Sequence, residues 1–123
     1  MSINNIDNLD VYNLSEALSD DIWDLVSKWD YFTRDTIGKQ LVRSADSISA
    51  NIAEGYGRFH YKENRNFCYY SRGSILETKG WLMKARRRNL SNQDILDQLI
   101  VKPDIIHHKL NGYMKFIGKK AES

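Results

Sequence analysis

Hydrophobic residues recur along the chain every three or four positions, which is the spacing of one face of an α-helix. No long stretch alternates between apolar and polar residues, as a half-buried strand would. Four helices are therefore predicted, at about residues 11–31, 36–56, 62–88 and 92–118. Their stripes are Leu14, Leu18, Ile22, Leu25, Trp29 and Phe32; Ile37, Leu41, Ala45, Ile48 and Ile52; Phe67, Tyr70, Ser74, Thr78, Trp81 and Ala85; and Ile95, Leu99, Ile106, Leu110, Tyr113 and Ile117.

The connections between these segments are only a few residues long, so neighbouring helices are expected to run antiparallel. This predicts an all-α protein with an up-down-up-down antiparallel four-helix bundle. A chain of 123 residues suits one domain. The bundle is expected to span residues 11–120 and to follow an N-terminal tail at residues 1–10.

Three local signals bear on the helix ends. Asp35 is placed to cap the second helix, and Ser91 followed by Asp94 is a variant of the capping box at the start of the fourth. Pro103 falls inside the fourth stripe. Because proline removes a backbone hydrogen bond and clashes with the preceding turn, we expect a kink or a break near residues 101–102.

The stretch NIAEGYGRFH, residues 51–60, contains two closely spaced glycines, Gly55 and Gly57. A dinucleotide-binding loop needs a third glycine and lies between a strand and a helix. These two glycines instead follow a helical segment. They are therefore predicted to end the second helix, since glycine readily adopts the left-handed conformation of a C-cap.

A polar stripe runs along the second helix and has two interpretations. It can be a solvated face on which Glu54 and Arg58 form a favourable pair four residues apart. It can also be a strip that meets another subunit or a nucleic acid. The stripe consists of Arg43, Ser47, Asn51, Glu54 and Arg58.

Two glycines, Gly73 and Gly80, lie seven residues apart on one face of the third helix. Each costs about 1 kcal/mol relative to alanine inside a helix, so close approach of another backbone is the expected compensation. The approaching segment can belong to the same chain or to another subunit. The sequence leaves both possibilities open.

The composition excludes global disorder, and the distribution of charge along the chain is uneven. With 41% apolar and 28% charged residues, the chain is not globally disordered. The net charge of +2 conceals an asymmetry, because residues 1–30 carry seven acids and one base while the rest carries nine acids and 17 bases. Either the acidic segment packs against the basic body, or a basic face is open to an anionic partner.

Cys68 is the single cysteine, so no intrachain disulfide can form, which is typical of a reducing cytoplasm. The first residues have neither the basic nor the apolar region of a signal peptide. No apolar run is long enough to span a membrane. We therefore expect a cytoplasmic protein without a membrane partner.

Basic residues concentrate near the two ends of the third helix. Between residues 56 and 72 they alternate with aromatic residues, and Lys84 begins a second basic run. Cations at a helix C-terminus favour the dipole, but three consecutive arginines exceed what a cap needs. Clustered Arg and Lys residues can contact phosphates, and nearby aromatic rings can stack on bases, so this combination also suits binding of RNA or single-stranded DNA. The nucleic-acid-binding candidates are Arg58, Lys62, Arg65, Arg86, Arg87 and Arg88.

Catalytic chemistry has little support in the sequence. His107 and His108 are adjacent and point about 100° apart on a helix, so they are poorly placed to share a metal. Cys68 lies among aromatic residues and is predicted to be a buried apolar side chain. Glu54 and Glu77 could meet across helices, but two glutamates fall short of a di-iron ligand set. We expect no enzyme activity, no metal and no cofactor.

Two segments carry a family resemblance. The stretches SADSISANIAEGYGR at residues 44–58 and FCYYSRGSILET at residues 67–78 resemble the four-helix-bundle proteins of the 23S rRNA intervening-sequence type, also called S23 ribosomal proteins. The similarity covers about residues 11–118, with Ser49-Ala50 and Pro103 as departures. The structural candidates that it marks are Asn51, Glu54, Gly55, Gly73, Ser74 and Glu77.

This resemblance implies an up-down bundle that assembles as a ring-like homopentamer. A relative, the accessory variability determinant of diversity-generating retroelements, has a basic surface, binds nucleic acid and works with a reverse transcriptase. The sequence and the resemblance together predict a non-enzymatic oligomer that binds RNA or DNA with little sequence specificity. The alternative is a structural or protein-interaction module without nucleic-acid binding, such as an accessory subunit of a larger complex.

Overall fold

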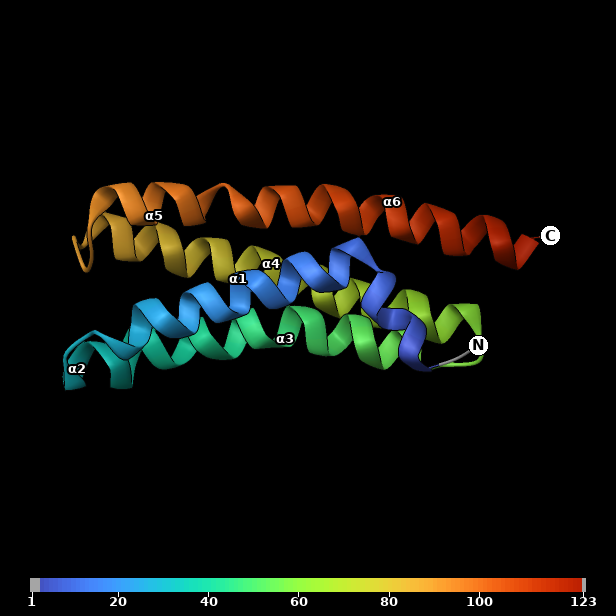
Figure 1. Cartoon of the computed structure of the whole chain (residues 1–123), viewed down its shortest axis with the longest axis horizontal. Coiled ribbons are helices and arrows are strands. Elements are labelled where there is room, and N and C mark those ends of the chain that lie inside the picture. Colours follow the sequence, from blue (N-terminus) through green and yellow to red (C-terminus); the bar gives the residue numbers. More distant parts are fainter. Residues whose placement is uncertain (1–2, 123) are drawn as a thin grey trace.

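The computed structural model describes residues 3–122, and these residues form helices and no strand. The long helices are nearly parallel to one axis, so the molecule is an elongated bundle (Figure 1). The elements are η1 (Ile3–Asn8), α1 (Asp10–Ser27), α2 (Tyr31–Thr33), the π-helical turn η2 (Arg34–Gly38), α3 (Lys39–Tyr56), α4 (Tyr61–Arg87), α5 (Gln93–Ile100) and α6 (Lys102–Glu122).

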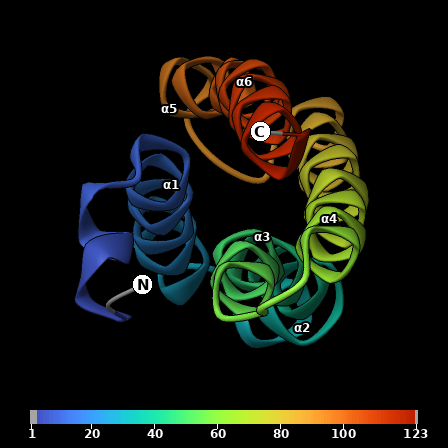
Figure 2. The same ribbon diagram turned by 90° about the vertical axis from the view of Figure 1, so that its right-hand side faces the viewer.

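The four helical layers are α1, the α2–η2–α3 segment, α4 and the α5–α6 pair, and each runs antiparallel to the next (Figure 1). Viewed along the bundle, α1 and α4 lie on opposite sides, and α3 and α6 separate them (Figure 2). The most extensive interface joins α3 to α4. The predicted all-α, up-down-up-down four-helix bundle is confirmed.

The core consists of one buried cluster to which all four layers contribute. The second predicted stripe is buried throughout, whereas Leu14 and Phe32 of the first and Ile95 of the fourth are exposed. The third predicted stripe is partly correct, because Thr78 and Ala85 are buried, whereas Tyr70 is exposed and its neighbour Ser71 is buried instead. The buried residues of α4 are Cys68, Ser71, Ile75, Thr78, Leu82 and Ala85.

Small polar side chains allow α3 and α4 to pack closely. The Ser71 hydroxyl donates to the Ile48 carbonyl oxygen at 2.9 Å, and the Thr78 hydroxyl donates to Ser44 Oγ at 2.9 Å. These bonds satisfy groups that burial would otherwise leave unpaired, which is costly. Thr78 was part of the predicted stripe, whereas Ser71 is buried where the apolar pattern predicted its larger neighbour Tyr70.

The turn between the first two long helices differs from its prediction. α1 ends at Ser27 instead of residue 31, and the next helix begins at Tyr31 instead of residue 36. Asp30 is the N-cap, and its carboxylate accepts a hydrogen bond from the Thr33 N–H at 2.8 Å. Asp35 was therefore the wrong cap; it lies inside the helix.

The fourth layer is divided into two helices, as predicted from the position of Pro103. α5 ends at Ile100, Val101 is in a turn, and α6 begins at Lys102. Proline in the first turn of α6 loses no helical hydrogen bond. The predicted capping pair is wrong, because the Asn92 side chain caps α5 by accepting the Asp94 N–H at 2.8 Å.

The two glycines after Asn51 have different roles. Gly55 lies inside α3 and is buried, and Gly57 is the C-cap with a φ of −77°. The helix therefore ends near the predicted position, but without the predicted left-handed residue. Gly55 instead permits close packing, because an added Cβ would lie 2.7 Å from Asn64 Oδ1 and 2.9 Å from Phe67 Cβ.

The predicted N-terminal tail is partly helical where the structure describes it. η1 covers Ile3–Asn8, and the first two residues of the tail lie outside the described residues. Leu9 connects η1 to α1 and packs against the core cluster. Among the described residues, no helix has the combination of length and apolar character that crossing a bilayer requires.

Candidate nucleic-acid interface

Ion pairs between neighbouring elements neutralise part of the basic surface. Arg43 on α3 contacts Glu77 on α4, Arg86 Nε lies 2.6 Å from Asp97 Oδ1, and Lys102 Nζ lies 2.9 Å from Asp21 Oδ2. Lys79 and Asp104 join α4 to α6 at 3.0 Å. These cations already have an acidic partner, so they are weaker candidates for binding an external anion.

The polar stripe of α3 lies along its junction with α4. Arg58 Nη2 is 2.9 Å from Glu54 Oε1, which confirms the predicted pair four residues apart, and its guanidinium lies 5.0 Å from the Phe67 ring centroid. Asn51 Nδ2 donates to the Ser47 carbonyl oxygen at 2.8 Å. The stripe is therefore occupied largely by contacts within the chain.

Of the residues marked by the family resemblance, Gly55 and Glu77 lie at the same junction, whereas Gly73 is exposed. Glu77 accepts hydrogen bonds from Arg43 and from Trp81 Nε1, the latter at 3.0 Å. The Ser74 carbonyl oxygen accepts a bond from Thr78. Glu54 and Glu77 have different basic partners, so the possible carboxylate pair of the sequence analysis is not formed.

The remaining binding candidates occupy the two ends of α4. Lys62 is exposed in its first turn, and Arg87 and Arg88 are exposed at its C-terminal end. None of these three side chains forms an ion pair with any residue between 6 and 122. The helix has 27 residues, so the two clusters are about 40 Å apart at a rise of about 1.5 Å per residue.

A groove between α4 and α6 contains further cations. Its volume is about 620 Å³, and we call it the α4–α6 groove. Arg65 and Arg72 line it from α4, and Lys115 and Lys119 line it from α6. Arg65 was a predicted candidate, and Arg72 lies in the same segment of alternating basic and aromatic residues. Lys115 and Lys119 were not predicted, since only the tertiary fold brings α6 beside this part of α4.

Tyrosines hold the two arginines of this groove. The Arg65 guanidinium lies 5.5 Å from the Tyr61 ring centroid and 6.0 Å from that of Tyr69. The Arg72 guanidinium lies 5.5 Å from the Tyr69 ring centroid and donates to Asn111 Oδ1 at 2.8 Å. Such cation–π contacts fix the planes of the guanidinium groups.

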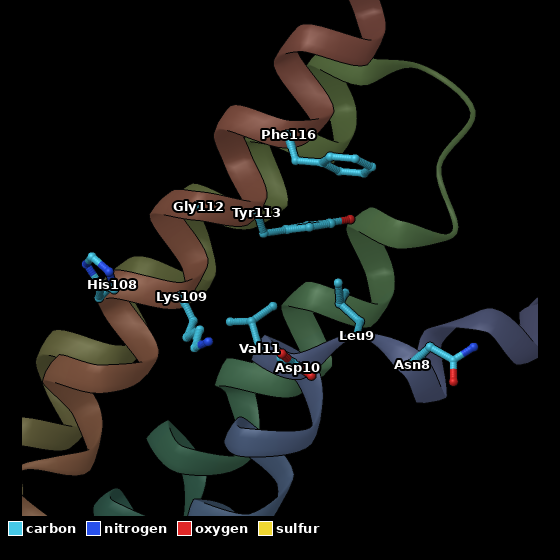
Figure 3. A pocket seen from close by; sticks show the side chains of 9 residues that line it. All are labelled: Asn8, Leu9, Asp10, Val11, His108, Lys109, Gly112, Tyr113 and Phe116. Atoms are coloured by element: carbon cyan, nitrogen blue, oxygen red, sulfur yellow. The ribbon is translucent and has the colours of Figure 1, made fainter.

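A second pocket, of about 400 Å³, lies between the start of α1 and α6. Tyr113 and Phe116 project from α6 toward Leu9 and Val11, whereas His108 points away from them (Figure 3). Burial raises the pKa of the Tyr113 hydroxyl, which accepts a hydrogen bond from Asn64 at 3.2 Å. The arrangement is that of an apolar gap between packed helices.

Gly73 and Gly80 are exposed, and a Cβ added to either would have no atom within 4 Å outside its own helix turn. Of the two alternatives that the sequence left open, a close approach by another described segment of the same chain is therefore excluded. Leu76 and Met83 lie on the same side of α4 and are 56% and 45% exposed. Gly73, Leu76, Gly80 and Met83, spaced by three and four residues, form an exposed strip that we call the α4 strip.

Cys68 is fully buried, as predicted, and burial raises the pKa of its thiol to about 11. A thiol with so high a pKa is a poor nucleophile at neutral pH. In the described part of the chain, no three side chains of histidine, cysteine, aspartate or glutamate are close enough to hold a metal ion.

The fold and these surfaces define an all-α, four-helix-bundle protein with a partly uncompensated basic surface. The family model of the 23S rRNA-intervening sequence protein matches residues 7–112, and the chain belongs to this family. A protein of unknown function from the S23 ribosomal protein family of Bacteroides thetaiotaomicron has the same fold, with a TM-score of 0.76 and 22% identity over 85% of this chain and 98% of that one. No curated protein matches the chain.

Proposed function

We propose that the protein is a non-enzymatic, oligomeric helical bundle that binds RNA or DNA through its basic surface with little sequence specificity. The observation that carries this proposal is the set of cations without an acidic partner on α4 and α6. Arg65, Arg72, Arg87 and Arg88 form no ion pair among the described residues, although six other cations do. Uncompensated cations with nearby aromatic rings suit phosphates and unpaired bases.

The proposal is tested by titrating labelled single-stranded and duplex RNA and DNA with the protein at several salt concentrations. Binding through phosphates releases counterions, so the logarithm of the affinity should fall linearly with the logarithm of the salt concentration. Unrelated sequences of equal length should bind with similar affinity. A protein that binds none of the four nucleic acids at low salt would contradict the proposal.

Self-assembly is the second part of the proposal, and a homopentamer is the expected state. The α4 strip is exposed and apolar. α1 lies on the opposite side of the bundle (Figure 2). It carries Trp23, which is 61% exposed. Packing α1 of one copy against α4 of the next would be a head-to-tail contact, the kind that closes into rings. Light scattering after size exclusion should give five times the chain mass of 14.4 kDa.

The exposed α4 strip also favours the alternative, a structural or protein-interaction module without nucleic-acid binding. In that case the strip would contact a different protein. A reverse transcriptase remains a proposed partner, because the resemblance implied one, and co-purification from the native cell would test it. A cytoplasmic location is likewise proposed from the single cysteine.

A further inference from the structure

We infer that the α4–α6 groove is a binding site for the phosphate backbone of single-stranded nucleic acid, with Arg65 and Arg72 as its two phosphate-binding forks. The inference rests on the proposed function and specifies where it takes place. Four cationic side chains line the groove, from two helices, against one carboxylate, that of Glu122. The arginine run at the end of α4 is therefore not the principal site.

The two arginines are pre-oriented before any ligand binds. Tyr61 and Tyr69 lie four residues on either side of Arg65, so one helix face presents alternating rings and guanidinium groups. A guanidinium held by an aromatic ring loses less conformational entropy when it binds a phosphate in bidentate geometry. Arg87 and Arg88 lack such contacts in the described structure, and both are exposed.

The charge of both arginines is uncompensated within the described residues. Their Nε atoms are buried, and neither donates a hydrogen bond to a described acceptor. A charged donor that has lost its water without gaining an acceptor is destabilising. An external anion does not reach the buried Nε atoms, but it can accept hydrogen bonds from the Nη atoms at the outer edge and neutralise the charge of each guanidinium.

The groove is shaped by a glycine on α6. A Cβ at Gly118 would lie 3.2 Å from Tyr61 Oη, closer than side chains usually pack. Gly118 therefore lets the Tyr61 ring lie against α6 and support Arg65. Lys115 and Lys119, four residues apart on α6, stand on the other wall of the groove.

The two arginines lie along the length of the groove. Arg65 and Arg72 are seven residues apart, which is about 10 Å along the helix at about 1.5 Å per residue. Helices in contact have axes about 8–10 Å apart, so the groove is shallow and a strand would lie along it past both guanidinium groups. The exposed edge of Tyr69 offers a surface for an unpaired base.

The test compares two double variants that remove the same charge from different places. Arg65→Gln with Arg72→Gln changes the groove. The matched control is Lys28→Gln with Arg34→Gln, which changes two exposed cations outside the proposed basic surface. The probe is a fluorescein-labelled 12-nucleotide RNA of mixed sequence, with the corresponding duplex and inorganic phosphate as competitors. Circular dichroism and size exclusion establish that each variant keeps its helicity and assembly.

We expect the groove variant to bind the single strand at least about tenfold more weakly, and the control to change by less than about threefold. Loss of two phosphate contacts should also reduce the slope of log affinity against log salt by about 1.4. The single strand should compete better than the duplex or inorganic phosphate. Equal weakening in both variants, or duplex competition equal to that of the single strand, would overturn the inference.

A charge-conserving variant keeps the inference testable if the glutamines disturb folding. Arg65→Lys with Arg72→Lys retains both charges but loses the planar fork, so binding should still fall several-fold. Unchanged binding by this variant would contradict recognition through guanidinium forks. If the native protein binds RNA and the groove variants bind it equally well, this site alone is refuted. If the native protein binds no nucleic acid, the proposed function itself is refuted.

Discussion

Gly55 lies where the backbones of α3 and α4 come closest together. The Cβ of an alanine would collide with Asn64 and Phe67, so the helices would have to separate. We predict that Gly55→Ala lowers the free energy of unfolding by about 1–3 kcal/mol, the usual cost of overpacking. Urea denaturation measures the effect.

Gly57→Ala is the matched control for this substitution. Its added Cβ would lie 3.7 Å from the nearest carbonyl oxygens, which is ordinary contact, and its φ is negative. The control should therefore change stability little. Equal destabilisation by both alanines would show that close packing at Gly55 has been misread.

The buried thiol of Cys68 is expected to make the free energy of unfolding fall at alkaline pH. Burial raises the pKa of its thiol from 9.0 to about 11, so the unfolded chain loses this proton at a lower pH than the folded chain does. The contribution of the neutral thiol is complete below pH 9 and is lost as the pH rises to about 11. We predict a falling urea midpoint over this range.

The variant Cys68→Ala separates the thiol from other groups that titrate in this range. Burial also raises the pKa of Tyr113, so part of the alkaline decline should persist without the thiol. The native protein should show the steeper decline. Identical pH dependence in the two proteins would contradict the assignment to Cys68.

At the scale of the helices, two aspartates near the start of the second layer have different roles, Asp30 as the N-cap and Asp35 inside the helix, which the sequence did not distinguish. Asp30 accepts the Thr33 N–H, and this hydrogen bond lowers the pKa of its carboxyl. Asp35 instead pairs with Lys39 at 3.3 Å on the exposed face of one helix. We predict that Asp30→Asn is tolerated, that Asp30→Ala lowers the urea midpoint, and that Asp35→Ala has a smaller effect.

The pH dependence of the same variants is a second measurement. Because the folded-state pKa of Asp30 is lowered, its contribution is present above the unfolded value of 3.8 and is lost as the pH falls through the folded value. Asp30→Ala should therefore lose part of the acid-induced decline in stability. A larger effect at Asp35 than at Asp30 would restore the original prediction of the cap.

The number of helices and the break in the last one could be predicted because both depend on local signals. The three-four spacing of Leu41, Ile48 and Leu110 marks buried faces, and Pro103 interrupts the last helix whatever surrounds it. The predicted stripe of α4 included Thr78 but not Ser71, because the large aromatic residue Tyr70 was chosen in place of its neighbour. Those hydroxyls are buried only because α3 lies close enough to accept their hydrogen bonds.

Only the α4 side of the candidate site could be predicted, because only α4 carries the alternating basic and aromatic residues. Arg65 was found because it lies between aromatic residues on α4, but the lysines at positions 115 and 119 have no local signal of function. Arg86 could not be excluded from the sequence, because Asp97 becomes its partner only when α5 packs beside α4. The partner of Arg58, Glu54, was predicted from the spacing of four residues. The ion pairs therefore distinguish arginines that already have a carboxylate partner from arginines that have none.

At the scale of the whole molecule, the acidic helix α1 and the basic helix α4 lie on opposite sides of the bundle (Figure 2). The acidic residues of α1 therefore do not neutralise the basic residues of α4 by packing on it. One contact does cross between α1 and α6, the pair of Asp21 with Lys102. This arrangement leaves both charged sides available to other molecules, and it permits the acidic side of one copy to meet the basic side of another.

The glycines of the α4 strip provide the sharpest test of self-assembly, because stability and assembly should respond in opposite directions. In a single chain, Gly73→Ala and Gly80→Ala add a Cβ to open space and improve helix propensity. Each should therefore stabilise the isolated fold by up to about 1 kcal/mol. If α1 of a neighbouring copy packs against these glycines, the new methyl groups should keep the helices apart and weaken the oligomer.

We predict that the double alanine variant has a higher urea midpoint at low protein concentration and a smaller mass by light scattering at micromolar concentration. Leu76→Ala should reduce the mass without the gain in stability, because it removes an apolar contact and leaves both glycines in place. Substitution of Trp23 of α1 by alanine should have the same effect on mass, since the proposed contact joins α1 of one copy to α4 of the next. Variants that keep the native mass while gaining stability would show that the strip is only solvent-exposed surface, and the head-to-tail ring would have to be abandoned.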